Sequence, residues 1–556
     1  SGLASNWRPK GWSPEGGLMK PVPCACSAPC EEGVLLQGTC VCSCSPRVRA
    51  RALLAAILGS SLSFIDVSAV NLALPAIQAD FGATSAQVQW ILETSGVVVA
   101  ALLLIGGALG DRVGRRKTFA AGTVLFAASS VACGLSAGPA TIIASRVLLG
   151  AASAFTIPGS LSLIGSVFPG ERRAFAAGLW SAATALAILG AQLAGGWILD
   201  ATSWRVIFFI PLPFGALVLL LLAGVPETRS GEPLASLDWK GAVLGFLALG
   251  SLTWGLLETQ ARGIGAATSG ALLLAAVFSR AFLRHERRHP SPLVPLETFR
   301  SRTFSGISLL TLLLYGGFGG SLFFLPFNLI QVQGYSALQA GAANLPFILV
   351  MAALAPASGL FSGRTGPRAV LVAGSLVTAL AFALFALPGV GGSYWTTFFP
   401  AACVLGAGFA LTVPALSSLV IASAPAGGIS LASALNSAIS RTAGVIAVAA
   451  MGSLLLFLFS VELDRRITAL GLPESAMAQA RAARSRLASA PVPRGLSEQE
   501  AESFRDAVKW SFVAGFRHLC VLAAVMAVGA AASAALLVEG RPAGPGLDRG
   551  SERGSP

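Results

Sequence analysis

Long apolar runs alternate with short polar stretches along most of this 556-residue chain. An α-helix needs roughly 20 mostly apolar residues to cross the hydrocarbon core of a bilayer. The runs that reach or approach this length are 52–72, 88–110, 118–136, 140–165, 174–199, 206–224, 241–258, 268–284, 304–330, 337–360, 369–387, 396–421, 429–459 and 512–537. Many are rich in Gly and Ala, which lets helices approach closely in lipid. The pattern predicts an all-α integral membrane protein with fourteen transmembrane helices.

The composition supports a membrane setting. Hydrophobic residues make up 54% of the chain and charged residues only 11%, whereas soluble globular proteins carry about 25% charged residues. The net charge is +13, but the 38 Lys and Arg residues form no compact basic domain. We therefore interpret the charge as a topology signal and expect no nucleic-acid partner. The chain has three His residues and no zinc-type Cys/His spacing, so we expect no metal site. The sequence also shows no cluster of catalytic residues, so we do not expect an enzyme.

Lys and Arg in the short loops predict the orientation. With the N-terminus inside, five predicted inner loops hold 16 Lys and Arg residues, whereas the short outer loops hold only Arg205 and Arg262. The inner loops are 111–117, 169–173, 225–240, 280–302 and 363–368. Cytoplasmic loops carry the excess of positive charge in membrane proteins. Both termini are therefore expected to lie on the cytoplasmic side of the cell membrane.

Three segments lie outside the predicted spans. Residues 1–48 hold six of the nine Cys residues, and their C-x-C spacing could bind a soft metal. This segment has no apolar core, so we expect a disordered cytoplasmic tail or a mis-assigned start, and we expect 540–556 to be disordered too. Residues 461–511 form one long polar outer loop. Within it, 474–490 is predicted to be helical, and Ser497 with Glu500 forms a capping box that opens the last helix.

An internal repeat relates the two halves of the chain. The segment GALGDRVGRR (107–116) matches GLFSGRTGPR (359–368) at four positions with a constant offset of 252 residues, and both copies follow an apolar run. Parallel repeats are a transporter design in which the substrate path lies between the halves. The expected domains are therefore a six-helix bundle (49–225), an inserted helix pair with a cytoplasmic linker (226–300) and a second six-helix bundle (301–539).

Several motifs resemble the major facilitator superfamily and its fourteen-helix drug:proton antiporter branch. GALGDRVGRRKTF (107–119) is similar to the superfamily's loop signature between the second and third helices. The segments that resemble the branch are FIDVSAVNLALPAIQADF (64–81), SRVLLGAASAFTIPGSLSLI (145–164), LDWKG (237–241), HPSPLVPLETFRSRTF (289–304) and QVQGYSALQAGAANLPF (331–347). The resemblance covers about residues 52–537.

This resemblance implies two six-helix bundles, alternating access and proton-driven export of amphipathic, often cationic, small molecules (multidrug efflux). It implies no cofactor, because the proton gradient supplies the energy. Three positions depart from the branch: Ala191 replaces a Pro, Leu149 replaces a Gln and Ser95 replaces an aromatic residue. An exporter or facilitator of one metabolite on the same fold therefore remains an alternative.

Three ionisable residues within predicted spans are candidates for proton coupling and the substrate cavity. Asp66, Glu93 and Arg146 would each be costly in hydrocarbon. Burial would bring Asp66 toward a range in which a proton gradient could load it. Arg146 needs an acid or carbonyl partner, either Asp66 or the fifth-helix backbone, and the matching Arg in the family is tied to proton coupling. The alternative is a purely structural role, with Glu93 solvated near the outer interface.

The charged turn between the second and third spans is a candidate inner gate. Its residues are Gly107, Asp111, Arg112, Gly114, Arg115 and Arg116. In the family, the Asp of this loop docks against a helix of the other half. Here that helix would begin near Gly428, where a helix N-terminus favours a carboxylate. Alternatively, the Arg residues only enforce the topology.

The remaining candidates are small or polar residues of later spans. Gly190, Gln192, Gly195 and Gly196 are expected to let the fifth helix pack closely or bend. Asn344, Asn436 and Arg441 could either line the path or tie helices together.

Overall fold

The structure is a computed structural model, and it describes residues 45–168, 171–228, 238–262, 265–289, 292, 294, 296–423 and 429–539. Residues 1–44 and 540–556 of the predicted tails lie outside this part, and the prediction of a tail up to residue 48 was wrong at its end, because the first helix already begins at Pro46. The elements are α2 (Pro46–Phe81), α3 (Ser85–Val113), α4 (Arg115–Gly134), α5 (Pro139–Val167), α6 (Glu171–Ala201), α7 (Trp204–Ile207), α8 (Pro211–Leu222), α9 (Trp239–Arg262), α10 (Ala266–Glu286), η1 (Leu296–Arg300), α11 (Arg302–Leu322), α12 (Leu325–Phe327), η2 (Asn328–Val332), α13 (Ala337–Ala342), α14 (Leu345–Thr365), α15 (Pro367–Phe385), α16 (Phe398–Ala422), α17 (Ile429–Ala469), α18 (Glu474–Ala483), η3 (Arg484–Ser489) and α19 (Glu498–Leu537). The all-α prediction is confirmed for the described residues.

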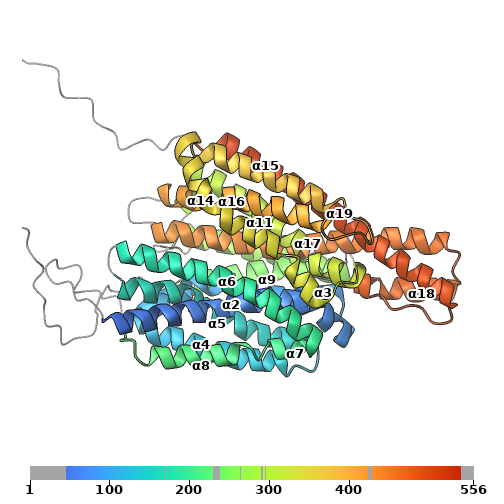
Figure 1. Cartoon of the computed structure of the whole chain (residues 1–556), viewed down its shortest axis with the longest axis horizontal. Coiled ribbons are helices and arrows are strands. Elements are labelled where there is room, and N and C mark those ends of the chain that lie inside the picture. The colour runs from blue at the N-terminus through green and yellow to red at the C-terminus, as the bar shows by residue number, and fades with distance from the viewer. Residues whose placement is uncertain are drawn as a thin grey trace, which may run out of the picture.

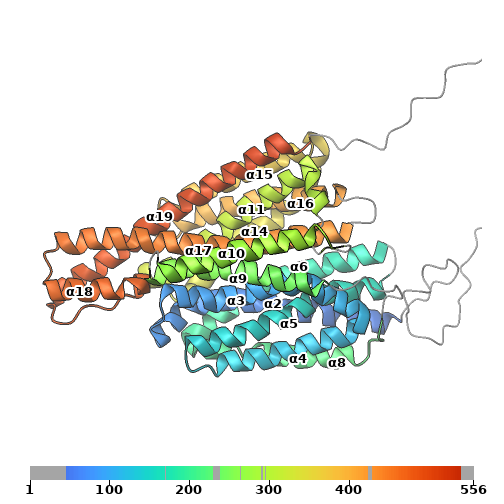
Figure 2. The same cartoon turned by 180° about the vertical axis from the view of Figure 1, so that it is seen from behind.

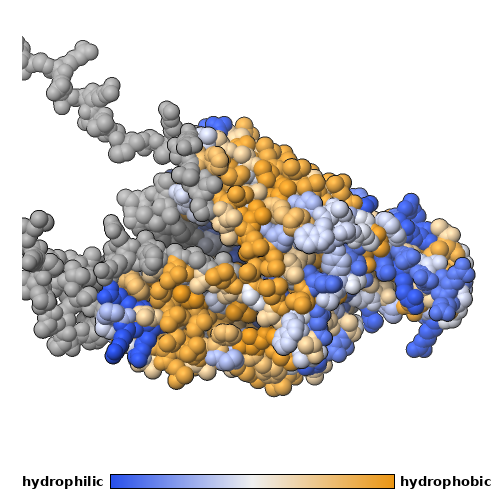
Figure 3. Space-filling model, viewed as in Figure 1, coloured by the Kyte–Doolittle hydropathy of each residue, from blue (hydrophilic) through white to orange (hydrophobic). Residues whose placement is uncertain are grey.

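The long helices run side by side along the longest axis of the molecule (Figure 1). The start of α2 and the end of α19 lie at one end, and α18 lies at the other (Figures 1 and 2). Hydrophobic residues cover most of the face in Figure 3 between these ends, whereas hydrophilic residues gather around α18. Leu186, Leu220 and Leu273 are each more than 60% exposed. A surface of this kind fits lipid, because water would penalise it.

Thirteen helices of the described part are long and apolar enough to cross a membrane. The predicted span 174–199 falls within α6, which runs from Glu171 to Ala201. The protein is therefore a multi-pass membrane protein, and the count of fourteen stays a prediction.

The two halves pack their helices in the same way. In the first half, α2 packs against α6 and α8, α3 against α5, and α4 against α5. In the second half, α11 packs against α17 and α19, α14 against α16, and α15 against α16. These pairs correspond in chain order, which agrees with the internal repeat. The helices α9 and α10 pack on each other, and α9 also contacts α3 of one half and α17 of the other (Figure 2).

The prediction of one polar loop over residues 461–511 was wrong at its first edge, whereas the helix that opens after Ser497 was predicted. Helix α17 continues to Ala469, and α19 already begins at Glu498. The helix α17 persists because Glu462 pairs with Arg465 and Arg466 one turn later. The predicted capping box is confirmed: Ser497 accepts from the Glu500 amide, and Glu500 accepts from the Ser497 amide. We call residues 462–505, a helical extension around α18, the protrusion (Figure 1).

Candidate functional site

A cavity of about 650 Å³ lies between the two halves. Its lining comes from α2, α3, α5 and α6 on one side and from α11, α14 and α17 on the other. Five predicted site residues line it: Asp66, Glu93, Gln192, Asn344 and Arg441. Small-molecule sites typically have volumes of about 300–1,000 Å³. The cavity is therefore large enough for a drug-sized molecule.

Arg146 lies directly behind this cavity in α5, and its side chain is fully buried. Its Nη1 donates to both carboxylate oxygens of Asp66, at 2.8 and 2.6 Å. Its Nε donates to the Ile91 carbonyl at 2.8 Å, and its Nη2 donates to the Ser95 hydroxyl at 2.9 Å. The guanidinium thus has a neutralising carboxylate and two further acceptors, which a buried charge requires.

The position of Ser95 explains one departure from the family pattern. Its hydroxyl is an acceptor for Arg146, and its backbone lies so close to α5 that a Cβ at Gly150 would come within 2.7 Å of the Ser95 carbonyl oxygen. The Gly150 site in α5 allows this contact because it has no side chain. Gly150 therefore lets α3 and α5 pack closely beside the ion pair, and the Ser95 side chain supplies an acceptor for it.

Glu93 projects from α3 into the same cavity and is 8% exposed. Neither a hydrogen bond nor an ion pair joins it to any residue that the structure describes. The proposed alternative, a solvated position at an interface, is therefore wrong for Glu93. A buried carboxyl group without a partner is one that a proton or a cationic ligand can neutralise.

The second half contributes a base and aromatic rings. Arg441 of α17 lines the cavity and has no ion-pair partner among the described residues. The rings of Phe318 and Phe347, both in the lining, pack against Phe409 with centroids 4.8 and 5.8 Å away. Tyr315 also lines the cavity and packs edge-on against Phe409. The second half thus presents aromatic rings and Arg441 to the cavity, opposite the acidic groups of the first half.

Asn436 ties two helices together, which is one of the two roles expected for it. It is not part of the cavity lining, and its Oδ1 accepts a hydrogen bond from the Thr311 hydroxyl at 2.8 Å. The contact ties α17 to α11 within the second half. Asn344, in contrast, lines the cavity.

The glycines of α6 have three different surroundings. Nothing lies within 4 Å of a Cβ built at Gly190, whereas one at Gly195 would meet the Ala69 Cβ at 3.4 Å. A Cβ at Gly196 would lie 2.6 Å from the Leu338 Cα and 2.7 Å from the Ala337 carbonyl oxygen. Only Gly196 is therefore required for close contact, and this contact joins α6 of the first half to α13 of the second.

Further contacts between the halves gather near the protrusion. Asp200 at the end of α6 accepts from the amides of Ala337 and Leu338, at 2.8 and 2.9 Å. Gln78 of α2 accepts from Gln331 and donates to the Arg486 carbonyl. These contacts close the gap between the halves at the α18 end.

The charged turn between α3 and α4 is tied to its own half. Gly114 has φ +122°, a conformation that favours glycine. Glu227, which follows α8, accepts from the amides of Arg116 and Lys117, at 3.0 and 3.2 Å. The Arg116 guanidinium donates to the Val225 carbonyl at 2.9 Å. A carboxylate at a helix N-terminus is stabilising, so Glu227 fixes the start of α4.

The predicted docking of Asp111 near Gly428 lies outside the described residues, because the side chains of Asp111 and Arg112 and the segment 424–428 are not described. Gly107 packs against Pro158 of α5. In the second copy of the turn, Arg368 donates to the Ala535 carbonyl at the end of α19. Each turn is thus anchored to the last helix region of its own half.

Comparison with known proteins agrees with this architecture. The family model of the Major Facilitator Superfamily matches residues 56–448. The chain belongs to the Major Facilitator Superfamily. It is therefore a transporter-family protein with a membrane setting and small-molecule substrates, and no catalytic activity is indicated.

Similar superfamily members are named as export proteins. The Tetracenomycin C resistance and export protein of Streptomyces glaucescens is 32% identical over 499 residues, covering 88% of this chain and 92% of that protein. The Multidrug efflux pump LfrA of Mycolicibacterium smegmatis is 29% identical over 480 residues, covering 84% and 92%. A bacterial homolog of the human lysosomal transporter Spinster, solved inward-facing and unoccupied, matches with a TM-score of 0.62 at 20% identity, covering 88% and 98%. The last comparison supports the fold alone.

The fifth helix of this superfamily member is continuous from Glu171 to Ala201. Ala191 stands where the antiporter pattern has Pro, and an Ala keeps the helical hydrogen bonds that a Pro would break. Of the two roles expected for the α6 glycines, close packing is observed at Gly196, and the bend stays a prediction.

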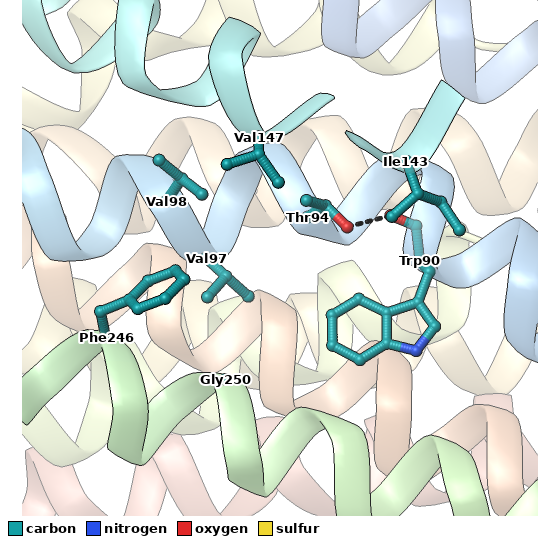
Figure 4. A pocket seen from close by; sticks show the side chains of 8 residues that line it. All are labelled: Trp90, Thr94, Val97, Val98, Ile143, Val147, Phe246 and Gly250. Atoms are coloured by element: carbon teal, nitrogen blue, oxygen red, sulfur yellow. Dashed lines mark hydrogen bonds between the residues drawn. The ribbon is translucent and has the colours of Figure 1, made fainter. Parts of the chain in front are cut away.

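A second, smaller pocket of about 320 Å³ lies between α3, α5 and α9 (Figure 4). Its lining is Trp90, Thr94, Val97, Val98, Ile143, Val147, Phe246 and Gly250. The Thr94 hydroxyl donates to the Trp90 carbonyl of its own helix at 2.6 Å. None of the eight residues is ionisable. This pocket is therefore no part of the ion-pair site.

Two groups were missed by the sequence analysis. The first is Glu227. The sequence VPET (225–228) shows an acid directly after an apolar run, but nothing in it indicates that this acid contacts the start of α4. The expectation of no metal site overlooked the spacing H-E-R-R-H (285–289), which places two imidazoles four residues apart. The structure brings these imidazoles together with Asp238.

Proposed function

We propose that this protein exports amphipathic small molecules from the cytoplasm by proton-coupled alternating access, in a bacterial-type cell membrane with both termini cytoplasmic. The single observation that carries the proposal is the buried Asp66–Arg146 pair beside a cavity that also holds the unpaired Glu93. Ionisable residues within a membrane are costly, and they typically mark ion and substrate pathways.

Glu93 is the better proton carrier of the two acids. Asp66 is neutralised by Arg146, and removing one partner of a buried ion pair costs about 3–5 kcal/mol. Glu93 has no such partner among the described residues. A proton on Glu93 and a cationic group in the cavity neutralise the same carboxylate, so they compete. This competition is the physical basis of antiport: the proton that enters releases the substrate.

Arg146 couples the two acids. It donates to Asp66 and lies on α5, which packs against both α2 and α3. When Glu93 loses its proton, the negative charge attracts Arg146 and weakens its hold on Asp66. The change in charge is thereby converted into a change in packing among the three helices of the first half.

The contacts at the α18 end supply one closed state of the transport cycle. Gly196 of α6 and Leu338 of α13 join the halves there, and Asp200 caps the start of α13. Access to the cavity from the α18 end requires that these contacts separate. Parallel repeats that rock about a shared cavity do this as rigid bodies.

The test is substrate-induced proton movement in proteoliposomes across a chemically varied panel of dyes and antibiotics. We expect Glu93→Gln to abolish proton movement while leaving substrate binding measurable. We expect Asp66→Asn to abolish transport, measured per amount of folded protein because loss of an ion-pair partner also lowers stability. Glu474→Gln, on the exposed α18, is the matched control. Wild-type proton movement in Glu93→Gln would remove Glu93 from the mechanism, and wild-type transport in Asp66→Asn would remove Asp66.

A second candidate function is export of one dedicated metabolite. The aromatic wall formed by Tyr315, Phe318 and Phe347 favours a flat aromatic substrate, and Arg441 could pair with an acidic group on it. Two relatives are named for single compounds, the Tetracenomycin C resistance and export protein and the Probable actinorhodin transporter of Streptomyces coelicolor, which is 30% identical over 426 residues. Uptake into everted vesicles of polycyclic acids but not of cationic dyes would favour this function.

A further inference from the structure

Two of the three histidines of the chain meet a buried carboxylate at the base of the inserted helix pair. Asp238 directly precedes α9, His285 lies in the last turn of α10, and His289 follows that turn. One ligand atom from each of these residues lies within 4.8 Å of the others. This site is separate from the cavity between the halves, since none of the three residues lines that cavity.

The local structure brings the two imidazoles onto one side. The His289 amide donates to the His285 carbonyl at 2.9 Å, so the helical spacing of four residues continues past the end of α10. The two rings lie with centroids 5.1 Å apart. Histidines four residues apart on a helix are a common arrangement for binding zinc.

Asp238 is held in place from both of its neighbouring helices. Its Oδ1 accepts from the Gly241 amide in α9 at 2.8 Å and lies 2.6 Å from His285 Nε2 of α10. Its Oδ2 lies 3.9 Å from His289 Nδ1, which is too long for a hydrogen bond. The side chain is only 2% exposed. The carboxylate is therefore oriented by one oxygen and leaves the other directed toward the second imidazole.

Two buried carboxylate oxygens at this place have no hydrogen-bond partner. They are Asp238 Oδ2 and Glu286 Oε1. Both lie beside Gly241, since a Cβ built there would be 2.4 Å from the first oxygen and 2.8 Å from the second. Buried acceptors without a donor are costly. The positive charge of a cation bound nearby would stabilise both carboxylates, and this observation is independent of the histidine spacing.

We propose that Asp238, His285 and His289 bind one divalent transition-metal ion, with zinc as the best match. Two imidazoles and one carboxylate are ligands that zinc accepts at about 2.0–2.2 Å, with a fourth position left to water or another group. Glu286 is a positioning residue: its Oε2 accepts from the Val294 amide at 2.8 Å, and its Oε1 faces the site. Without metal, a proton joins His285 to Asp238; the metal displaces this proton when it binds.

A metal at this site would connect the start of α9 with the end of α10. Helix α9 contacts both halves of the transporter, and Val294 belongs to the linker that leads into the second half. The bound ion would therefore fix the linker against the inserted helix pair. Removal of the ion by a chelator would release the linker.

The test is metal binding to the purified full-length chain in detergent. The six cysteines of the N-terminal segment are changed to Ser to remove a competing site; they are Cys24, Cys26, Cys30, Cys40, Cys42 and Cys44. Zn²⁺ is titrated by competition with a chromogenic chelator, and Co²⁺ reports tetrahedral nitrogen and oxygen ligation by its visible absorption. We expect one equivalent per chain.

The variants His285→Gln, His289→Gln and Asp238→Asn should each weaken Zn²⁺ binding by at least about 100-fold, because loss of a residue that only hydrogen-bonds to a ligand already costs about 10–100-fold. The matched control is His518→Gln, which changes the remaining histidine of the chain, in α19, and should bind Zn²⁺ as the parent does. Monodisperse elution of each variant shows that it is folded. Equal Zn²⁺ affinity in the parent and in His289→Gln would overturn the proposal and leave a hydrogen-bonded His–Asp cluster in its place.

Discussion

The contact between α6 and α13 gives a prediction with a calculable size. In Gly196→Ala, the new methyl group would lie 2.6 Å from the Leu338 Cα and 2.9 Å from the Leu338 nitrogen. Both are backbone atoms, so no side-chain rotation relieves the overlap and the helices must separate. Overpacking of this kind costs about 1–3 kcal/mol. The cost applies only to the state in which the halves touch at the α18 end.

The population of that state should therefore fall. An energy of about 1–3 kcal/mol changes the ratio of closed to open forms by about 5- to 150-fold, since each 1.4 kcal/mol is a factor of ten. The intrinsic helix propensity gained by replacing Gly with Ala is the same in both states and cancels. We expect the ratio to shift toward the form that is open at the α18 end.

The assay is a distance distribution between spin labels at Ala201→Cys and Gln339→Cys, which lie on exposed positions across this contact. It is measured in a background without the native cysteines. Gly190→Ala on the same helix is the matched control, because nothing lies within 4 Å of its new Cβ. The longer distance should gain population in Gly196→Ala and not in Gly190→Ala. Indistinguishable distributions for the two variants would refute the reasoning.

Three further predictions concern stability and local order. Ser95→Ala leaves Nη2 of the buried Arg146 without its acceptor, so it should lower the free energy of unfolding by about 1–3 kcal/mol in denaturant titrations; a titration unchanged from wild type would contradict this. Glu227→Gln removes a charge from the start of α4 and should cost about 0.3–1 kcal/mol, read as faster amide exchange in the first turn of that helix. Faster amide exchange only in other segments would contradict the role of Glu227 at the start of α4. Ser497→Ala breaks the capping box of α19 and should cost about 1 kcal/mol, seen as protease cleavage near residue 498, while Ser497→Asp should restore protection.

The transmembrane helices could be predicted from the sequence because lipid offers the backbone no hydrogen-bond partners. A segment in hydrocarbon must satisfy its own amides and carbonyls, so a long apolar run implies a helix. The capping box of Ser497 and Glu500 was equally predictable, since both partners lie within one turn. The continuation of α17 beyond residue 461 was missed because the polar residues there were interpreted as a loop, although Glu462 and its Arg partners support a helix.

The site was predictable in its residue types and not in its pairing. The cost of a buried guanidinium required a partner for Arg146, and Asp66 was one of two options; only the fold distinguishes them. The role of Ser95 depends on the approach of α3 to α5, which no local pattern encodes. The contact at Gly196 joins residues about 140 positions apart and was invisible for the same reason.

The protrusion has a consequence for how this transporter can be controlled from outside the bilayer. Helix α17 has 41 residues, a length of about 60 Å, which is twice the hydrocarbon thickness. The protrusion belongs covalently to the second half, yet Gln78 of the first half donates to Arg486 and accepts from Ser489 within it. An antibody fragment that binds the protrusion and the end of α2 together would hold the two halves in contact. It would thereby stop export without entering the membrane.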